Sequence, residues 1–561
     1  MKKRVSTIIS LLLALLMLAG CGTDAASIVI VYERQPEERE MLRFEDIEYI
    51  RPELDTLYDT GDALLEALEN PFKLNEAAEL LDRFLMECSN FDTMYMLAYI
   101  RSCMDVHDEF YDEEYGWCMV ADAERQLVYE EVMLACEDSV HLSSLVELFG
   151  EDIRLHESEL SESADISYED YIYITERQAA LMARYRDLAV EAAADIESIA
   201  IDYNELDAAY EAYYEKYNPI LAELYIELIE LQREHAGMLG YDSFAELVYE
   251  FEYDRDYSVE DVLEYLDYIK KHLAPIRREV QEQGLEDLLI YDPVDERELE
   301  LYLETVAWGF GGRIEEVWRF MKQYDLYDFE ESGNKAEISF QAYLGDYKAP
   351  YLFLYPYCDT GDIMTMCHEF GHYADSYIRQ GAYENTDLAE TFSQTMQLLS
   401  IDQLLCVMTE DEFYSYSTMV MLDILSSFVE QAALAEFEIR AHEMENPTVE
   451  DLNRLCLEIS EAYGLYVPGE DLYYSMYWVD IPHLFESPFY VISYAVSASA
   501  ALELYEMELE EAGSGVESFI TMSESGVATL MEAVDATGLE DPLSEESVRQ
   551  AAEFIRSRLP M

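Results

Sequence analysis

Residues that break a regular backbone are scarce in this sequence, and their scarcity constrains the fold to long helices. The 561 residues include only 22 glycines and 14 prolines, about 6% of the chain and roughly half the usual share. Residues 167–236 are the clearest case, with one proline, Pro219, and no glycine. Because these two residue types mark turns and helix ends, this stretch predicts one or two very long helices. A sandwich or barrel with many tight turns is disfavoured.

Apolar periodicity supports the same conclusion elsewhere in the chain. Residues 75–88 and 258–273 each place apolar side chains on one helical face, next to a residue suited to cap a helix. Strand signals are few, at residues 337–340 and at residues 351–355, which are bounded by prolines. The sequence therefore predicts a mainly helical protein with one small sheet near its middle.

The charge balance is strongly acidic. The chain has 34 lysines and arginines against 121 aspartates and glutamates, a formal net charge of −87. Such a surface repels phosphates and anionic lipid headgroups, so we exclude nucleic acid as a partner. The simpler interpretation of the charge is a well-solvated surface. Attraction of cationic substrates is the functional alternative.

The amino terminus has the pattern of an export signal. Three basic residues are followed by an apolar stretch at residues 8–19, interrupted only by Ser10. A membrane-spanning helix needs about 20 apolar residues, so this shorter stretch favours a signal core. Residues 18–21, Leu-Ala-Gly-Cys, resemble a bacterial lipobox, in which Cys21 would carry a lipid. We expect a lipoprotein on the outer face of the cytoplasmic membrane, facing the extracellular side; an uncleaved anchor is the alternative.

The rest of the chain has no second stretch that we predict to cross a membrane. The 9 cysteines lack CxxC or CxxxC spacing, so a cysteine metal cluster is not expected. Apart from Cys21 they are interpreted as buried thiols or structural disulfides. We predict four segments along the chain: a lipoprotein signal peptide at 1–20, a tether at 21–44, an amino-terminal helical domain at 45–204 and a larger domain at 205–561.

Residues 368–372 have the sequence His-Glu-Phe-Gly-His, an HExxH segment. Residues four apart share one face of a helix, so His368 and His372 can bind the same Zn²⁺. Glu369 would then lie beside the metal and could accept a proton from water. A solvated or core-packed histidine pair is disfavoured, because this combination is rare by chance in a chain with 9 histidines.

A catalytic zinc usually takes a third protein ligand and keeps one position open. Spacing alone leaves three downstream acids as candidates: Glu384, Asp387 and Glu390. Glu390 is favoured because residues 388–396 have the pattern of a second buried helix that could pack on the first. Ser393, one turn further, could hydrogen-bond a ligand or simply pack between helices.

These residues and several other segments of the chain resemble the thimet oligopeptidase and oligoendopeptidase F group of zinc metallopeptidases. The resemblance spans about residues 205–561. It rests on REHAGMLGY at 233–241, YPY at 355–357, DIMTMCHE at 362–369, ETFS at 390–393 and IPHLFESPFYVISYA at 481–495. It implies a zincin-like fold, with a large helical shell around a deep channel and a small β-sheet beside the zinc helix. Such a channel admits short flexible peptides and excludes folded proteins.

The resemblance also implies a role for each matched residue. The ligands of one Zn²⁺ per chain would be His368, His372 and Glu390. The general base would be Glu369. The donors of hydrogen bonds to the substrate and to the developing oxyanion would be His483, Tyr490 and Tyr494. Residues 205–561 are accordingly interpreted as the zinc metallopeptidase catalytic domain.

The predicted function is that of a zinc-dependent oligoendopeptidase that hydrolyses short unstructured peptides. We expect the strand at 351–355 to pair with the backbone of an extended peptide. A monomer is favoured. Two alternatives stay open: a peptide-binding lipoprotein that has lost catalysis, and a helical zinc carboxypeptidase. The latter would need a basic group to hold the terminal carboxylate of its substrate.

Overall fold

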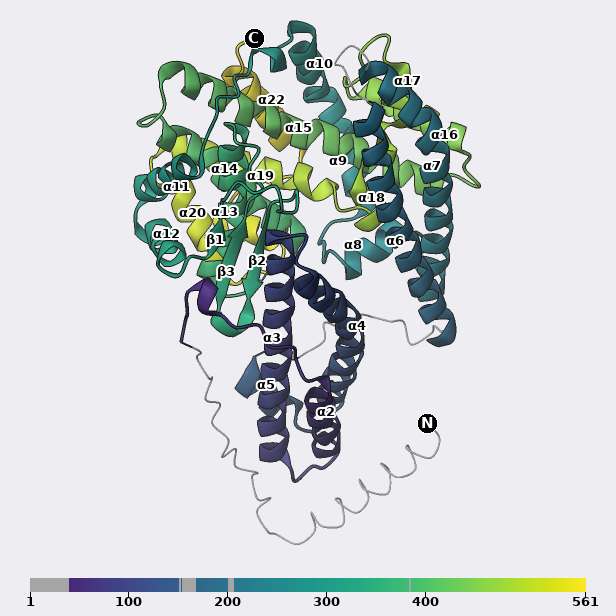
Figure 1. Ribbon diagram of the computed structural model, residues 1–561, viewed down its shortest axis with the longest axis vertical. Helices are drawn as coiled ribbons and strands as arrows, with labels where there is room; N and C mark the ends of the chain where they lie inside the picture. The colour runs from purple at the N-terminus through teal and green to yellow at the C-terminus, as the bar shows by residue number, and fades with distance from the viewer. Residues whose placement is uncertain (1–39, 151–152, 154–167, 200–205, 383–384) are drawn as a thin grey trace. The chain divides into compact units, whose positions relative to one another are not determined.

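The computed structural model describes residues 40–150, 153, 168–199, 206–382 and 385–561 (Figure 1). The expected signal peptide, Cys21, most of the tether and Glu384 lie outside these residues. The chain divides into two compact units. The domain boundary that we placed between residues 204 and 205 stays a prediction.

The smaller unit is helical. It contains α2 (Leu54–Leu68), residues 74–89 of α3 (Leu74–Met104), residues 119–137 of α4 (Glu109–Glu137) and α5 (Leu142–Phe149). These helices bury apolar side chains against one another, among them Leu64, Leu81, Phe84, Val132 and Leu145. The helix predicted at residues 75–88 is confirmed, but as part of the 31-residue α3.

The larger unit has a single extended core built mainly from helices. Two of them, α6 (Tyr168–Ile199) and α7 (Leu206–Leu239), are the very long helices predicted from the lack of glycine and proline, and α7 continues through Pro219. A capping box at Ser258 begins the helix at Val259–His272, as its sequence predicts. The next helices along the chain are α8 (Phe244–Phe251), α9 (Val259–His272), α10 (Ala274–Gln283), α11 (Glu296–Phe310), α12 (Gly312–Tyr324), α13 (Gly361–Arg379) and α14 (Thr386–Leu404). They are followed by α15 (Glu410–Glu443), α16 (Val449–Ala462), α17 (Asp471–Met476), α18 (Pro482–Glu486), α19 (Ile492–Glu510), α20 (Ser514–Ser525), α21 (Leu530–Thr537) and α22 (Glu545–Arg558).

The small sheet has three strands in the order β1-β3-β2. They are β1 (Tyr327–Asp328), β2 (Phe340–Leu344) and β3 (Ala349–Phe353), with β1 parallel and β2 antiparallel to β3. Both predicted strands are found near their expected positions. Pro350 is accommodated inside β3 because β1 pairs only with Leu352 and Phe353, so no β1 partner is opposite the proline nitrogen. The two-residue β1 is too short to give a sequence pattern.

The position of β3 corrects one expectation. Leu352 and Phe353 of β3 are paired on both sides, so a peptide could not be added along this part of the strand. Among the strands of the described chain, β2 lies at the edge of the sheet, next to β3 only. Helix α13 packs against both β2 and β3 (Figure 1).

Helix α15 is long and apolar enough to be compared with a membrane span. Its 34 residues include a stretch of 18 with a mean hydropathy of 1.3, so by length and composition alone it could cross a membrane. However, 72% of that stretch is buried inside the structure, where α15 packs against α14 and α19. This burial is typical of the core helix of a globular unit.

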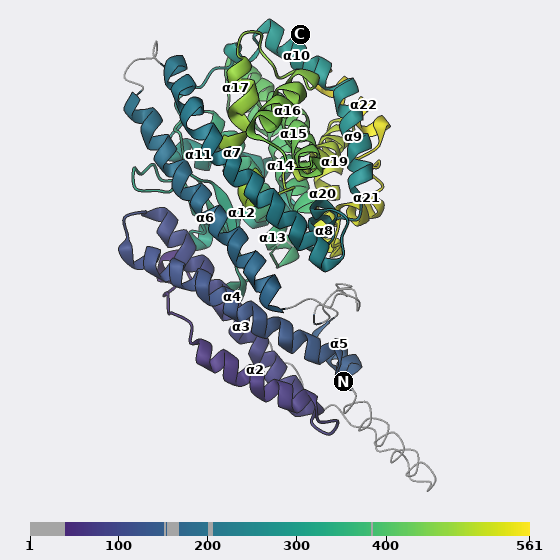
Figure 2. The ribbon, with the colours of Figure 1, turned by 90° about the vertical axis from the view of Figure 1, so that its right-hand side faces the viewer.

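Helices α13 and α14, both labelled in Figure 2, pack against each other. Their backbones approach closely at Gly371. A Cβ atom at this position would lie 2.5 Å from the carbonyl oxygen of Phe392 and 2.6 Å from the Cα of Ser393. Real Cβ atoms do not approach backbone so closely, so only glycine allows this helix spacing. The contact brings the helix of the HExxH segment against the helix of Glu390.

We expect Gly371→Ala to destabilise the protein by about 1–3 kcal/mol, because the added methyl group must force two packed backbones apart. Urea unfolding of the purified chain measures this change. Gly237→Ala is the matched control. Gly237 lies in α7, and a Cβ added there would have no atom within 4 Å, so alanine should be neutral or slightly stabilising. Equal stability of the two variants would contradict the close approach.

Candidate metal centre and active site

The start of α13 is fixed by two aspartates. The carboxylate of Asp362 accepts hydrogen bonds from the backbone N–H groups of Tyr357, Cys358 and Asp359, at 2.9, 2.7 and 3.2 Å. Asp359 Oδ1 accepts one from the N–H of Gly361 at 2.7 Å. The loop that follows β3 is thereby folded onto the first turn of the helix. This arrangement sets the rotation of α13 and the direction in which its histidines point.

The structure brings together the three predicted metal ligands. Glu390 Oε2 lies 3.4 Å from His368 Nε2 and 3.8 Å from His372 Nε2. One ligand atom from each of the three side chains lies within 4.8 Å of the others. The two imidazole rings are 5.1 Å apart and nearly perpendicular, and Glu390 is buried. The site therefore combines one face of α13 with one face of α14.

Asp387, the alternative third ligand, points elsewhere. Its Oδ2 accepts a hydrogen bond from Tyr257 at 2.7 Å, and its Oδ1 lies 3.4 Å from Arg255 Nε in a fully buried ion pair. Arg255 also donates to Ser493 Oγ at 2.9 Å, which connects α14 to α19. Asp387 is thus a structural residue, and no local pattern in the sequence would have revealed its arginine partner.

A hydrogen-bonded chain of side chains orients His368. Gln397 Nε2 donates to Asp423 Oδ2 at 2.7 Å, so Gln397 Oε1 faces His368 Nδ1 at 3.2 Å and accepts its proton. Nδ1 is thereby held by Gln397, so Nε2, which faces Glu390, is the nitrogen available to a metal ion. Gln397 lies two turns after Glu390 on the same face of α14, a spacing that could have suggested it.

Ser393 also supports the third ligand. Its hydroxyl lies 3.0 Å from Glu390 Oε2 and 2.9 Å from the carbonyl oxygen of the same residue. Of the two interpretations offered for Ser393, contact with a candidate ligand is therefore the one observed.

The three residues predicted as hydrogen-bond donors form a cluster of rings. The centroids of His483 and Tyr490 are 5.5 Å apart, those of Tyr490 and Tyr494 are 5.4 Å apart, and those of His483 and Tyr494 are 6.1 Å apart. Tyr490 donates a hydrogen bond to Glu390 Oε1 at 2.7 Å. The segment from 483 to 494 therefore lies against the candidate metal ligands.

A strained turn aims Tyr490 at Glu390. Phe489 has a φ of +63°, an uncommon conformation for a bulky residue. Its N–H donates to Glu438 Oε1 at 2.8 Å, and the carbonyl oxygen of Pro488 accepts from Tyr253 at 2.8 Å. These buried bonds, together with the packing of the Phe489 ring, hold the turn in place. Sequence reasoning missed this support because its members are far apart along the chain.

Burial adjusts the protonation of the site. It raises the pKa of the Glu369 carboxyl to about 7, with the charge of His368 opposing the rise and that of Glu390 adding to it. Burial also lowers the pKa of His372 to about 4, which keeps that imidazole in the neutral form that binds metals. On Glu390, the hydrogen bond from His368 and the nearby imidazoles outweigh burial, so its pKa is lowered.

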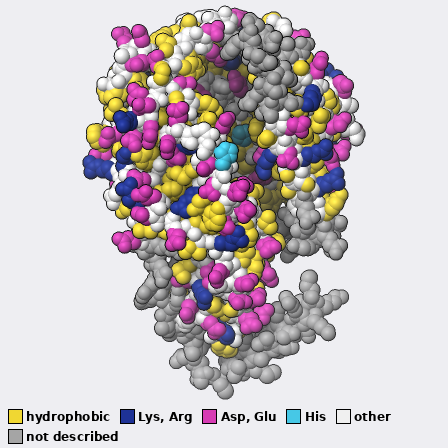
Figure 3. Space-filling view, in the orientation of Figure 1, with side chains coloured by type: hydrophobic (Ala, Val, Ile, Leu, Met, Phe, Trp, Pro, Cys, Tyr) yellow, Lys and Arg dark blue, Asp and Glu magenta, His cyan; other side chains and the backbone are white. Residues whose placement is uncertain are grey.

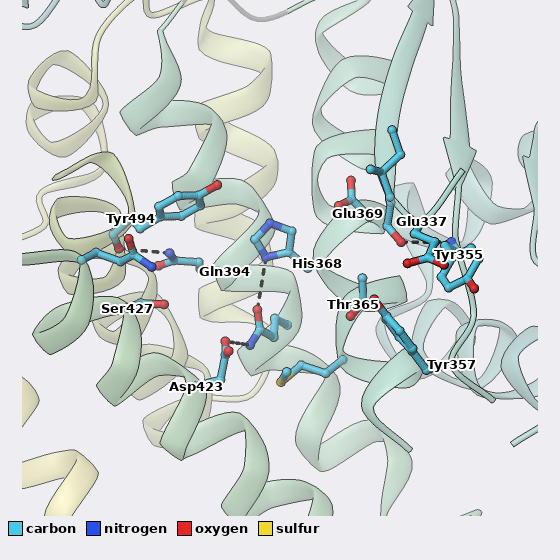
Figure 4. A pocket seen from close by; sticks show the side chains of 15 residues that line it. Glu337, Tyr355, Tyr357, Thr365, His368, Glu369, Gln394, Asp423, Ser427 and Tyr494 are labelled. Atoms are coloured by element: carbon cyan, nitrogen blue, oxygen red, sulfur yellow. Dashed lines mark hydrogen bonds between the residues drawn. The ribbon is translucent and has the colours of Figure 1, made fainter. Parts of the chain in front are cut away.

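A pocket of about 390 Å³ opens beside these residues (Figure 4). His368 and Glu369 lie on its wall, and Figure 4 shows Tyr494 and Gln394 together on one side of His368 and Glu337 with Tyr355 on the other. The lining comes from the segment before β2, the loop after β3, and helices α13, α14, α15 and α19. A peptide entering this pocket would meet both Glu369 and the candidate metal site.

The donor set fits zinc. Two imidazole nitrogens and one carboxylate oxygen are the ligands that catalytic zinc sites commonly use, with a fourth position left for water or substrate. His368, which is one of the three, lines the pocket, so the open position can face the space that a substrate would occupy.

Two protein-family models match the chain. One, described as the peptidase M3 N-terminal domain, covers residues 44–158, and the other, described as peptidase family M3, covers residues 328–550. The chain belongs to peptidase family M3. The second match contains every residue of the metal cluster and of the ring cluster, and the resemblance drawn from the sequence is confirmed at the level of this family.

Two curated proteins are similar to this M3 chain. The oligoendopeptidase F homologue of Borreliella burgdorferi is 27% identical over 358 residues, which are 61% of this chain and 56% of that protein. The oligopeptidase PepF of Bacillus subtilis is 24% identical over 402 residues, which are 65% of this chain and 57% of that protein. The matched region therefore spans little more than half the length of these relatives.

Solved structures share the M3 fold. A structure of PZ peptidase A with an inhibitor superposes with a TM-score of 0.78 at 20% identity, covering 92% of this chain and 98% of that one. The prediction of a mainly helical fold with a small sheet is confirmed.

We expect Gln397→Ala to weaken zinc binding by about 10- to 100-fold, since His368 would lose the acceptor that holds its ring and tautomer. Competition with a chromogenic chelator measures the affinity. Gln403→Ala, near the end of the same helix and outside the cluster, should leave it unchanged. Unaltered zinc affinity in the Gln397 variant would argue against an orienting role.

Proposed function

We propose that this M3 chain is a zinc-dependent oligoendopeptidase that hydrolyses peptide bonds in short, unstructured peptides. The observation that carries the proposal is the convergence of His368, His372 and Glu390 beside a buried acid, Glu369, on the wall of a pocket. The peptidase names of the two curated relatives support it.

The metal would provide the electrophilic part of the chemistry. One Zn²⁺ per chain, held by His368, His372 and Glu390, would lower the pKa of a water molecule and polarise the scissile carbonyl. Glu369 accepts the proton from the attacking water and later delivers it to the nitrogen of the leaving amine. Its pKa of about 7 suits both steps, because a group that must take and return a proton works best near neutrality.

The three rings of His483, Tyr490 and Tyr494 have two different roles in this proposal. Tyr494 lines the pocket, so its hydroxyl can donate to the carbonyl oxygen on which negative charge develops. Burial lowers the pKa of His483, so its ring is a neutral imidazole that can donate an N–H as a second stabilising group. Tyr490 donates to Glu390, which makes it primarily a positioning residue for the third ligand.

We infer that the peptide backbone runs along the segment before β2. Glu337, Ile338 and Ser339 line the pocket, and they lead into β2, one of the two outer strands of the sheet. An extended peptide can pair with backbone there without a demand for particular side chains.

The alternatives are less well supported. A carboxypeptidase needs a cation to hold the terminal carboxylate, and the described residues around the pocket include neither lysine nor arginine. A pure peptide-binding protein has no use for a buried acid beside a three-ligand cluster.

We also propose that the protein is a monomeric lipoprotein, attached by a lipid on Cys21 at the outer face of the cytoplasmic membrane. The net charge of −87 would repel the phosphates of nucleic acid, which supports the proposal that nucleic acid is not a partner. Loss of the protein from the membrane fraction in a Cys21→Ala variant tests the attachment.

Glu369→Gln should lower kcat for an internally quenched peptide by about 10²–10⁴-fold, because the amide cannot accept the proton of water. The variant should keep its zinc, measured by elemental analysis. A chelator should abolish the activity of the unaltered chain, and added zinc should restore it. Normal cleavage by the variant would refute the assignment of the base.

Tyr494→Phe and Tyr490→Phe should differ in effect. Loss of the Tyr494 hydroxyl should lower kcat by about 10²–10³-fold at unchanged zinc affinity, as expected when a donor to the oxyanion is removed. Loss of the Tyr490 hydroxyl should also weaken zinc binding, since Glu390 loses a hydrogen bond. Kinetics and chelator competition on both variants separate these outcomes, and identical profiles would contradict the division of tasks.

A further inference from the structure

The pocket beside His368 is rich in hydrogen-bond acceptors and holds negative charge on two sides. Asp423 lies on the wall formed by α15, and Glu337 lies on the side of the sheet (Figure 4). Among the described residues that line the pocket, no lysine or arginine balances these carboxylates. We propose that this pocket binds a cationic group of the peptide substrate, either a basic side chain or the α-amino terminus; this inference rests on the proposed peptidase function.

A buried acceptor without a donor points to the missing ligand group. Gln394 is 2% exposed and lines the pocket. Its Nε2 donates to the carbonyl oxygen of Tyr494 at 3.0 Å, and this carbonyl can only accept, so the orientation of the amide is fixed. Its Oε1 has no hydrogen-bond partner in the described structure. An unpaired buried acceptor is costly, and an N–H donor from a bound peptide would satisfy it.

Helix α15 provides the charge and further acceptors. Asp423, Ser427 and Gln431 all line the pocket, and their spacing of four residues places them on one face of the helix. Asp423 Oδ2 is occupied by Gln397, whereas no hydrogen bond is found for Oδ1 within the part of the chain that the structure describes. A cation here would bond to a carboxylate that is partly shielded from water, where such bonds are strongest.

The surface charge alone would not locate such a site. Acidic side chains are spread over the face shown in Figure 3, with lysines and arginines among them, and no single acidic patch dominates. The net charge of −87 would attract basic peptides in general. The pocket is where that attraction can become selective, because Asp423, Glu337 and the unpaired amide oxygen of Gln394 all line it.

Two groups of a peptide carry suitable positive charge: a lysine or arginine side chain, and the α-amino terminus. The first is tested with N-acetylated quenched peptides that each carry one lysine, placed at a different position around the cleaved bond in each peptide. The norleucine peptide of the same length and acetylation is its control. Norleucine peptides with and without a free α-amino group test the second.

We expect the cationic member of at least one pair to have about a tenfold higher kcat/KM, as a charge-assisted hydrogen bond would give. The Asp423→Asn variant should reduce that ratio toward one. The asparagine oxygen can still accept from Gln397, so the charge is removed without releasing His368. Asp411→Asn, an exposed position in the first turn of α15 and outside the pocket, should leave the ratio unchanged.

Binding to the zinc-loaded Glu369→Gln chain gives a readout that does not depend on cleavage. Fluorescence anisotropy should show tighter binding of the cationic peptide, by a similar factor, and weaker discrimination when Asp423→Asn is added. Equal kcat/KM and equal binding within both pairs would overturn the inference while the peptidase function stands. If no peptide is cleaved at all, the proposed function fails, and the binding ratios alone decide the inference.

Discussion

The active site depends on one steric constraint, the contact between two helix backbones at Gly371. The absence of a side chain there lets α14 lie directly on α13, with the Phe392 carbonyl and Ser393 Cα where a Cβ would otherwise be. At this spacing the Glu390 carboxylate of α14 lies 3.4 and 3.8 Å from the imidazole nitrogens of His368 and His372 on α13. The glycine of the HExxH segment is therefore a structural requirement of the metal site, although it carries no chemistry itself.

Around this contact, buried polar side chains connect α14, α15, α19 and the turn at Phe489. Arg255 joins Asp387 of α14 to Ser493 of α19, and Glu438 of α15 accepts from the backbone of the strained turn at Phe489. Burying a charge costs free energy, and pairing and hydrogen bonding only offset that cost. These buried groups therefore do not by themselves show that the fold is stabilised. Arg255 and Glu438 connect the segments that carry Glu390 and Tyr490, so their role is to hold these two side chains in position.

Much of the architecture was accessible from the sequence because the signals are local. Helix length follows from the lack of glycine and proline at 167–236, and the HExxH spacing identifies one face of one helix. Glu390 could be favoured over Asp387 because residues 388–396 have a buried helical pattern. The central position of β3, the partner of Asp387 and the Gln397–Asp423 pair could not be predicted in this way. Each depends on residues distant in sequence, and a two-residue strand such as β1 has no periodicity to detect.

The polar positions of α14 at 390, 394 and 397 share one side of the helix, and they serve three different purposes. They provide a ligand, an acceptor in the pocket and the group that sets the tautomer of His368. An inserted residue between them would rotate one part of the set by about 100° relative to the other. The candidate metal ligand, the acceptor in the pocket and the group that contacts His368 are thus held in one register by a single helix. An insertion between any two of these positions would therefore break the register between them.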